Sequence, residues 1–203
     1  MDINILDIAD IVGIGAFALS GFLIAVRKKL DLLGVVLFAF LTALGGGILR
    51  DIIVERIPLS LKDSTPSMIV ITVILFALIL QISKKKSVER FKIFILSDAV
   101  GLASFSISGA LVALQNNFNF FGIVILSLST AIGGGVLRDV LINEVPVILT
   151  SGFYATVSVF MATCLYAVQF FGYLNSTTIS LIFVFGLSLR MIAFYREWRL
   201  PVL

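Results

Sequence analysis

The chain has 203 residues, of which 60% are hydrophobic and 13% are charged, and its formal net charge is +3. A soluble domain carries about 25% charged residues, whereas the apolar residues here gather in runs of about 20, the length of a helix that crosses a bilayer. The composition therefore excludes a soluble globular domain and predicts an integral membrane protein. Because the runs are continuous and do not alternate with polar residues, helices are favoured over a β-barrel.

The chain has no histidine and a single cysteine, Cys164. The lack of histidine excludes histidine metal sites and Ser-His-Asp triads, and a lone cysteine cannot form an internal disulfide. We expect Cys164 to pack inside a helix. The sequence contains no recognisable metal cluster, nucleophile–base pair or nucleotide-binding loop. We therefore expect no enzyme activity, no metal or cofactor, and no nucleic-acid partner.

Hydropathy predicts seven membrane-spanning helices. Their approximate ranges are 5–26, 32–56, 66–83, 93–115, 119–143, 147–170 and 177–195. Pro66 suits the first turn of the third helix, where a backbone N–H is not needed. No lysine or arginine precedes Arg27, so the first run lacks the basic start of a signal peptide and is predicted to be a true span.

The basic residues of the short loops indicate the orientation. On one side of a seven-span chain lie the basic loops 27–29 and 84–92 and the basic tail with Arg196 and Arg199. The loops on the other side carry no charge, apart from 56–63, where acidic residues accompany the basic ones. We predict an N-terminus outside and a C-terminus in the cytoplasm. Lys84 to Lys86 are expected to contact anionic lipid head groups.

A repeat at an offset of 88 residues organises the chain. The segment Gly45-Gly46-Gly47-Ile48-Leu49-Arg50-Asp51 returns as Gly133-Gly134-Gly135-Val136-Leu137-Arg138-Asp139. The same offset relates Asp10 to Asp98, Phe17 to Phe105, Ser20 to Ser108 and Thr42 to Thr130. A unit of three spans is odd, so the second copy crosses the membrane in the opposite direction, as in the inverted repeats of transporters. The expected units are 1–88, 89–176, and a seventh helix with its tail over 177–203.

Each triple glycine lies at the middle of its predicted span. Glycine weakens a helix by about 1 kcal/mol per residue relative to alanine, and interrupted helices paired across an inverted repeat form substrate or ion sites. We therefore predict that the helices 32–56 and 119–143 are kinked at Gly45 to Gly47 and at Gly133 to Gly135, beside a path. The alternative is that the glycines only allow the helices to pack closely.

Charges follow each triple glycine. If the helix continues, Arg50 and Asp51 lie within the membrane and need a partner or a water cavity; the alternative is a solvated loop. Neighbours on a helix point about 100° apart, so Arg50 and Asp51 are not expected to face each other. Depth in the membrane favours two other pairs. They are Asp10–Arg50 in the outer half and Asp98–Arg138 in the inner half.

These pairs would leave Asp51 and Asp139 free to face an aqueous path. Asp51 would share a helix face with Glu55, and Asp139 with Asn143. Ser20 and Ser108 lie on the first and fourth helices, as do Ser104 and Ser106. These small residues would either pack tightly or form the polar lining of the path.

The doubled G-G-G-x-L-R-D motif, the inverted repeat and the seventh helix resemble the trimeric intracellular cation (TRIC) channels, chiefly their prokaryotic members, whose repeat is also called the glycine-transporter domain. The resemblance implies a 3+3+1 helical fold in a prokaryotic plasma membrane. It implies a homotrimer with one pore inside each subunit, between the second and fifth helices. It also implies conduction of monovalent cations, mainly potassium, with sodium as the other candidate.

Arginines in a narrow pore repel cations. Passage would require the aspartates to neutralise Arg50 and Arg138, or the arginines to act as a gate. The second functional hypothesis is a secondary transporter of glycine or a similar small zwitterion, whose two charged ends would suit the Arg/Asp pairs. A third is a helical membrane scaffold, against which the buried charges argue.

Overall fold

The computed structural model describes residues 4–150 and 153–198, and this part of the chain is all-helical. Arg199, one of the basic residues used to predict the orientation, lies outside it. The elements are α1 (Ile5–Arg27), α2 (Leu32–Ile53), α3 (Leu59–Lys62), α4 (Thr65–Ile79), the 3-10 turn η1 (Ile82–Lys84), α5 (Ser87–Gln115), α6 (Phe120–Leu141), α7 (Val147–Thr150), α8 (Ala155–Phe170) and α9 (Ser176–Tyr195).

Polar caps start the long helices where the sequence leaves the apolar runs. The side chain of Asn4 accepts hydrogen bonds from the first turn of α1. Asp31 caps α2 by accepting from the Gly34 N–H, and Asn119 caps α6 in the same way by accepting from Gly122. Such caps satisfy N–H groups that have no partner within the helix. Both copies of the repeat therefore start their second helix with the same device.

Five helices, α1, α2, α5, α6 and α9, are long and apolar enough to cross a membrane. The expected third and sixth spans are shorter: α4 has 15 residues, with Pro66 in its first turn, and the predicted range 147–170 is divided between α7 and α8. The range 58–63, expected to be a loop, contains the short helix α3. The all-helical membrane class is thus confirmed, whereas the count of seven complete spans remains a prediction.

The second and fifth predicted spans end earlier than expected. The helices α2 and α6 stop at Ile53 and Leu141 instead of near 56 and 143. Just beyond each end, Glu55 and Asn143 adopt left-handed backbone conformations, with φ of 56° in both. A residue in this conformation cannot continue a right-handed helix.

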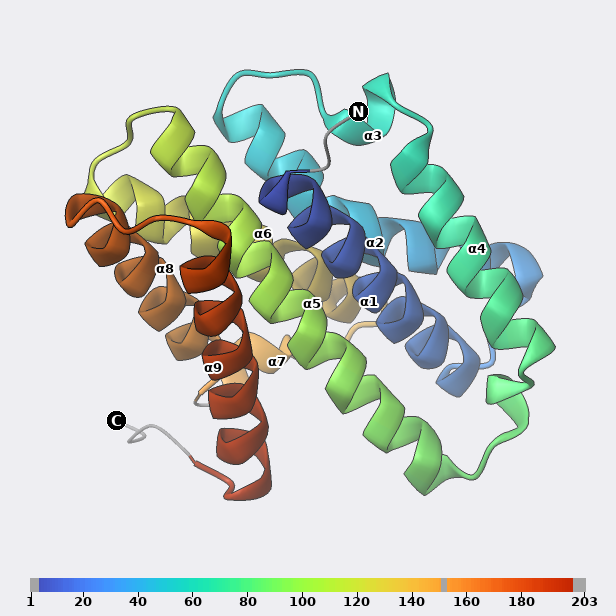
Figure 1. Ribbon diagram of the computed structural model, residues 1–203. Helices are drawn as coiled ribbons and strands as arrows, with labels where there is room; N and C mark the ends of the chain where they lie inside the picture. Colours follow the sequence, from blue (N-terminus) through green and yellow to red (C-terminus); the bar gives the residue numbers. More distant parts are fainter. Residues whose placement is uncertain (1–3, 151–152, 199–203) are drawn as a thin grey trace.

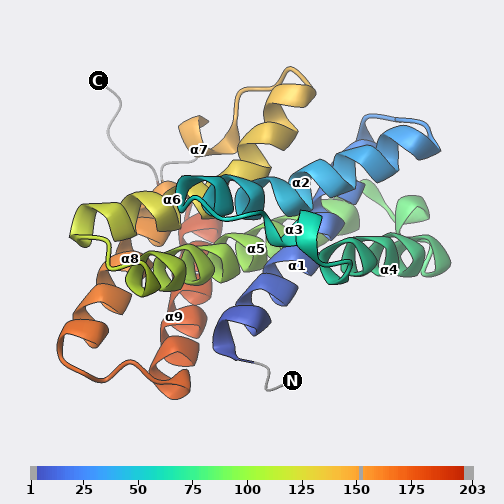
Figure 2. The ribbon, with the colours of Figure 1, turned by 90° about the horizontal axis from the view of Figure 1, so that it is seen from above.

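The helices α1 and α5 pack against each other at the centre of the molecule (Figure 1). The short helix α4 packs on α1, and α8 occupies the matching place on α5. The helix α9, outside the duplication, packs on α5 and α8. Figure 2 shows α2 and α6 side by side across the molecule. The paired contacts α1–α4 and α5–α8 are those expected of a repeated unit.

The triple glycines form the crossing of α2 and α6. A Cβ added to Gly46 would overlap the carbonyl oxygen of Thr130, and one added to Gly134 would overlap that of Thr42. Both helices are continuous through their glycines, so the hydrogen-bond ladder is not broken there. Close packing, the alternative reading of the motif, therefore describes this crossing. A bend of either helix axis remains a prediction.

Two phenylalanines pack against two glycines in a reciprocal contact between α1 and α5. Phe105 lies against Gly13, Phe17 lies against Gly101, and the two rings are 5.4 Å apart between centroids. A Cβ on either glycine would overlap the opposite ring. The offset that relates Phe17 to Phe105 thus relates the two halves of one reciprocal contact.

The glycines of one run are expected to differ in their tolerance of alanine. Gly46→Ala and Gly134→Ala should lower stability strongly or prevent folding, because the added Cβ meets backbone of the opposite helix, which cannot move aside. Gly47 has only the flexible end of Arg50 nearby, at 4.0 Å from an added Cβ. Gly47→Ala should be neutral or gain up to about 1 kcal/mol of helix propensity.

Thermal unfolding of the three variants in detergent would measure this difference. Equal losses at positions 46 and 47 would contradict the close crossing.

Candidate functional site

An ion pair joins α1 and α2 just beyond the glycine crossing. The Arg50 Nη1 lies 2.6 Å from the Asp10 Oδ1. The same Nη1 donates to the Ser108 hydroxyl, which itself donates to Asp10 at 2.6 Å. Ser108 belongs to the second copy of the repeat. The cluster therefore fastens α5 to the first copy.

The second copy has the equivalent cluster. The Arg138 Nη1 lies 2.7 Å from the Asp98 Oδ1 and donates to the Ser20 hydroxyl at 2.6 Å. Both pairs predicted from depth in the membrane are present. Ser20 and Ser108 are not simply packing residues, because each hydroxyl is a partner of the arginine from the opposite copy.

Both arginines are buried, with 1% of their surface exposed. A buried charge is tolerated only when it is paired and hydrogen-bonded. Each guanidinium also bonds the following residue: the Nε atoms of Arg50 and Arg138 lie 2.9 Å from Asp51 and 2.8 Å from Asp139, respectively. The prediction that neighbouring residues would not face each other was wrong, because a long arginine side chain can fold back to the adjacent carboxylate.

Asp51 and Asp139, expected to face water freely, are also buried and bonded. The second carboxylate oxygen of Asp51 accepts the backbone N–H of Leu59, and that of Asp139 accepts the N–H of Val147. These bonds tie the ends of α2 and α6 to the short helices α3 and α7. The two aspartates therefore anchor the loops that follow α2 and α6. This role depends on how the loops fold back, so the sequence did not predict it.

The shared helix faces expected for Asp51 with Glu55 and for Asp139 with Asn143 do not form, because α2 and α6 end at Ile53 and Leu141, before Glu55 and Asn143. Arg56, rather than Glu55, contacts Asp51: its Nη2 lies 2.6 Å from the Asp51 Oδ1. The repeat equivalent of Arg56 is Glu144, so no arginine from that position reaches Asp139.

Glu144 instead joins the end of α1. Its carboxylate lies 2.7 Å from the Lys28 ammonium and 2.8 Å from the Arg27 guanidinium, at the exposed surface. The hydrogen bond from Lys28 and the charge of Arg27 hold the pKa of Glu144 below its ordinary value. Because this pKa is lowered by folding, the stabilisation is present above the ordinary pKa of glutamate and is lost as the pH falls through the lowered one.

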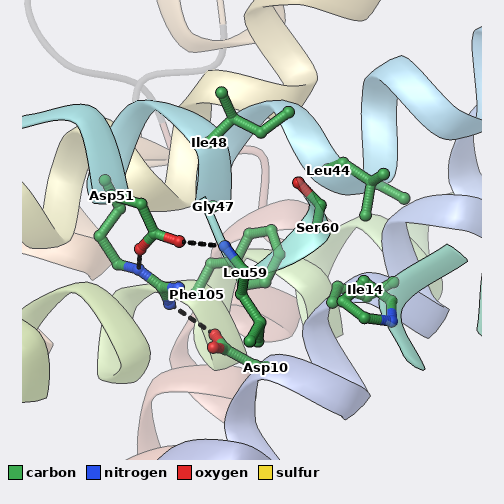
Figure 3. Close-up of a pocket in the computed structure, with 12 residues that line it drawn as sticks. Asp10, Ile14, Leu44, Gly47, Ile48, Asp51, Leu59, Ser60 and Phe105 are labelled. Atoms are coloured by element: carbon green, nitrogen blue, oxygen red, sulfur yellow. Dashed lines mark hydrogen bonds and ion pairs between the residues drawn. The ribbon is translucent and has the colours of Figure 1, made fainter. Parts of the chain in front are cut away.

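A cavity of about 280 Å³ opens beside the first cluster (Figure 3). Asp10, Arg50 and Asp51 lie on its wall, together with Gly47 of α2 and Ser60 of α3. It has room for a water molecule. Among the described residues the buried Ser60 hydroxyl has no hydrogen-bond partner, so the polar wall can bind water or an ion.

A second, smaller cavity of about 160 Å³ lies beside the other cluster. Arg138, Asp139 and Gly135 line it, together with Tyr154. It has no room for a water molecule. Seven of the predicted pore residues line these two cavities, whereas Gly45, Gly46, Gly133, Gly134, Asp98, Ser20 and Ser108 do not. No group of acidic or cysteine residues in 4–150 and 153–198 could hold a metal ion.

Two residues near the second cavity were missed from the sequence. Arg190 of α9 is buried and lies over the Tyr154 ring, with 4.8 Å from its Cζ to the ring centroid. The available sequence signal for Arg190 was an arginine within the apolar range 177–195. No sequence signal distinguished Tyr154 from the other aromatic residues of the chain.

The fold and the buried charges define an all-helical membrane protein in which two equivalent ion-pair clusters flank a glycine crossing. A family model described as "Glycine transporter" matches residues 7–82 and 95–169, one match in each copy of the repeat. The chain belongs to this family.

Curated relatives of this chain are named as membrane proteins. The UPF0126 membrane protein YvgT of Bacillus subtilis is 29% identical over 96% of this chain and 95% of its own length. The UPF0126 inner membrane protein YadS of Escherichia coli is 34% identical over 72% of this chain and 70% of its own. A UPF0126 membrane protein of Deinococcus radiodurans is 37% identical over 69% of this chain, and the match spans 64% of that relative.

Solved structures confirm the resemblance to the TRIC family. A prokaryotic TRIC channel crystallised in 0.5 M KCl has a TM-score of 0.89 and 31% identity, covering 97% of this chain and 98% of that one. The TRIC orthologue of Rhodobacter sphaeroides has a TM-score of 0.87 and 28% identity, covering 95% and 98%. A structure from work on conductance through TRIC cation channels has a TM-score of 0.83 and 36% identity, covering 97% and 96%.

The buried pairs are expected to dominate stability, and the exposed pair to contribute little. Asp98→Asn should cost about 3–5 kcal/mol of unfolding free energy, because it leaves the buried Arg138 with one carboxylate fewer. Glu144→Gln, the matched change at an exposed pair, should cost about 1 kcal/mol or less. Chemical unfolding in detergent at pH 7 would measure both, and equal costs would contradict the burial argument.

Proposed function

We propose that this protein is a channel for monovalent cations, chiefly potassium. The observation that supports this most directly is the charge of the two buried clusters. The first holds Asp10, Arg50 and Asp51, and the second holds Asp98, Arg138 and Asp139. Each has two carboxylates for one buried guanidinium, and hence a formal charge of −1 among its buried residues, which attracts cations and repels anions. In the first cluster the exposed Arg56 also pairs with Asp51. The aspartates thus remove the repulsion expected from the arginines.

The proposed path lies within one subunit. It runs from the first cavity, past the crossing of α2 and α6, to the second cavity. In this conformation the helices touch at Gly46 and Gly134, so conduction requires α2 and α6 to separate or bend there. The small contact made by glycines favours such a movement, because few side chains must repack. The permeant ion is K⁺ or Na⁺, and no cofactor is needed.

The assembly and orientation follow from the family likeness and the loops. Three copies form a homotrimer surrounded by membrane lipids, as the name of the TRIC neighbours suggests. Seven spans, with α4 and α8 as the short third and sixth, place the N-terminus outside and the C-terminus in the cytoplasm of a prokaryotic cell. The likeness to solved TRIC cation channels supports the cation as the permeant species.

A secondary transporter of glycine or a similar zwitterion is the second candidate. Two equivalent cavities separated by a closed contact, one with room for water and one without, are the arrangement that alternating access requires. Reconstitution in liposomes separates the two functions. Unitary potassium currents would support the channel, and saturable glycine uptake without unitary current would support the transporter.

Neutralising a buried carboxylate should weaken the preference for cations. Asp51→Asn removes one carboxylate charge from the first cluster, and the potassium-to-chloride permeability ratio should fall about fivefold, corresponding to about 1 kcal/mol for a unit charge near the path. Reversal potentials in a salt gradient would measure the ratio.

Asp63→Asn is the matched control. Asp63 is exposed near the start of α4 and is absent from the residues lining the first cavity, so the ratio should not change. An unchanged ratio in a folded Asp51→Asn protein would contradict the proposed role of the cluster.

A further inference from the structure

Every residue that lines the second cavity is related at the repeat offset of 88 to one that lines the first, whereas Asp10, Ile14, Ala43 and Phe105 line the first cavity alone. The equivalent lining residues of similar chemistry are Leu44 and Ile132, Gly47 and Gly135, Ile48 and Val136, Arg50 and Arg138, Asp51 and Asp139, and Leu59 and Val147. Each of these pairs is identical or of similar chemistry. Two positions differ in kind: Ser60 and Pro66 in the first cavity are replaced by Ile148 and Tyr154 in the second.

These two substitutions contribute to the difference between the cavities. Isoleucine for serine and tyrosine for proline add side-chain volume to the wall. The first cavity is about 280 Å³ and has room for a water molecule, whereas the second is about 160 Å³ and has none. The missing space lies where Tyr154 stands. Its hydroxyl is 3.5 Å from the place that a Cβ on Gly135 would occupy.

Arg190 packs against the tyrosine in this position. Its guanidinium lies over the Tyr154 ring at 4.8 Å, a favourable cation–π distance. It comes from α9, which has no counterpart in the duplicated part of the chain. The first cavity therefore has no tyrosine at the equivalent position and no equivalent of α9 beside it. The asymmetry arises from two substitutions in the repeat and from one helix outside it.

We propose that Tyr154 is the plug that closes the second half of the ion path, and that Arg190 holds the plug in its closed position. The proposal rests on the proposed conduction path. In this conformation the first cavity has room for water and the second has none. Opening requires the Tyr154 ring to leave Arg190 and Gly135, which would enlarge the second cavity. The gate is one-sided, because the equivalent residue Pro66 has no long side chain to swing.

Thiol labelling tests the plug without any current. In a Cys164→Ala background, Ile48→Cys and Val136→Cys place a thiol at equivalent positions of the two walls. A small water-soluble thiol reagent, entrapped in liposomes and added outside them, reaches both faces of the membrane. Ile48→Cys should react at least tenfold faster than Val136→Cys. Tyr154→Ala should raise the rate of Val136→Cys at least tenfold and leave that of Ile48→Cys unchanged.

Two further variants separate the ring from its clamp. Tyr154→Phe keeps the ring, so Val136→Cys should remain slow. Arg190→Gln removes the cation above the ring and should speed labelling of Val136→Cys even if Tyr154→Ala does not fold. The plug is overturned if Val136→Cys reacts as fast as Ile48→Cys in the otherwise unchanged protein, or if neither a folded Tyr154→Ala nor a folded Arg190→Gln raises its rate.

Single-channel recording then links the plug to conduction. Tyr154→Ala should raise the open probability several-fold without changing the unitary conductance. Tyr154→Phe should resemble the unchanged protein. If the unchanged protein carries no current, the proposed channel function fails, while the labelling rates still decide whether Tyr154 closes the cavity. Currents with an open probability indifferent to Tyr154→Ala would leave the channel standing and reject the gate.

Discussion

A buried arginine held between two carboxylates is the interaction on which the rest of this structure depends, and it occurs twice. Arg50 and Arg138 are almost fully buried, and neither would be tolerated there without its aspartates. Satisfying them fixes α1 on α2 and α5 on α6. The second aspartate of each cluster ties the short helix that follows. The charges therefore position the helices and the loops, as well as the proposed path.

The two copies of the repeat complete each other. Ser108 bonds the arginine of the first copy, Ser20 bonds that of the second, and the glycines of α2 and α6 meet across the same axis. Neither copy can satisfy its own buried polar groups alone, which explains why the unit is found as an interlocked pair. The two ion-pair clusters are separated by the crossing of α2 and α6, where glycines make a contact that involves few side chains. Movement is therefore expected at the crossing, where it disrupts least.

Duplication also provides two sites that can diverge. Arg56 bonds Asp51, whereas the equivalent Glu144 turns to Lys28 and Arg27 on another helix. Pro66 leaves a cavity, whereas Tyr154 fills one. The ion-pair clusters are alike in the two copies, as expected where burial penalises any unpaired charge. The residues around them differ, so the two cavities differ in size.

The all-helical membrane class, the repeat at an offset of 88 and the two ion pairs could be predicted from the sequence, because hydropathy, spacing and the order of the charged residues follow from chain order alone. Only the folded chain shows where α2 and α6 end, that Asp51 and Asp139 are bonded, and that Tyr154 meets Arg190. These features depend on segments that fold back onto the helices, and on side chains brought together from distant parts of the chain. Periodicity and spacing predict where the helices lie and which residues recur. They do not predict which loop atom will reach a buried carboxylate.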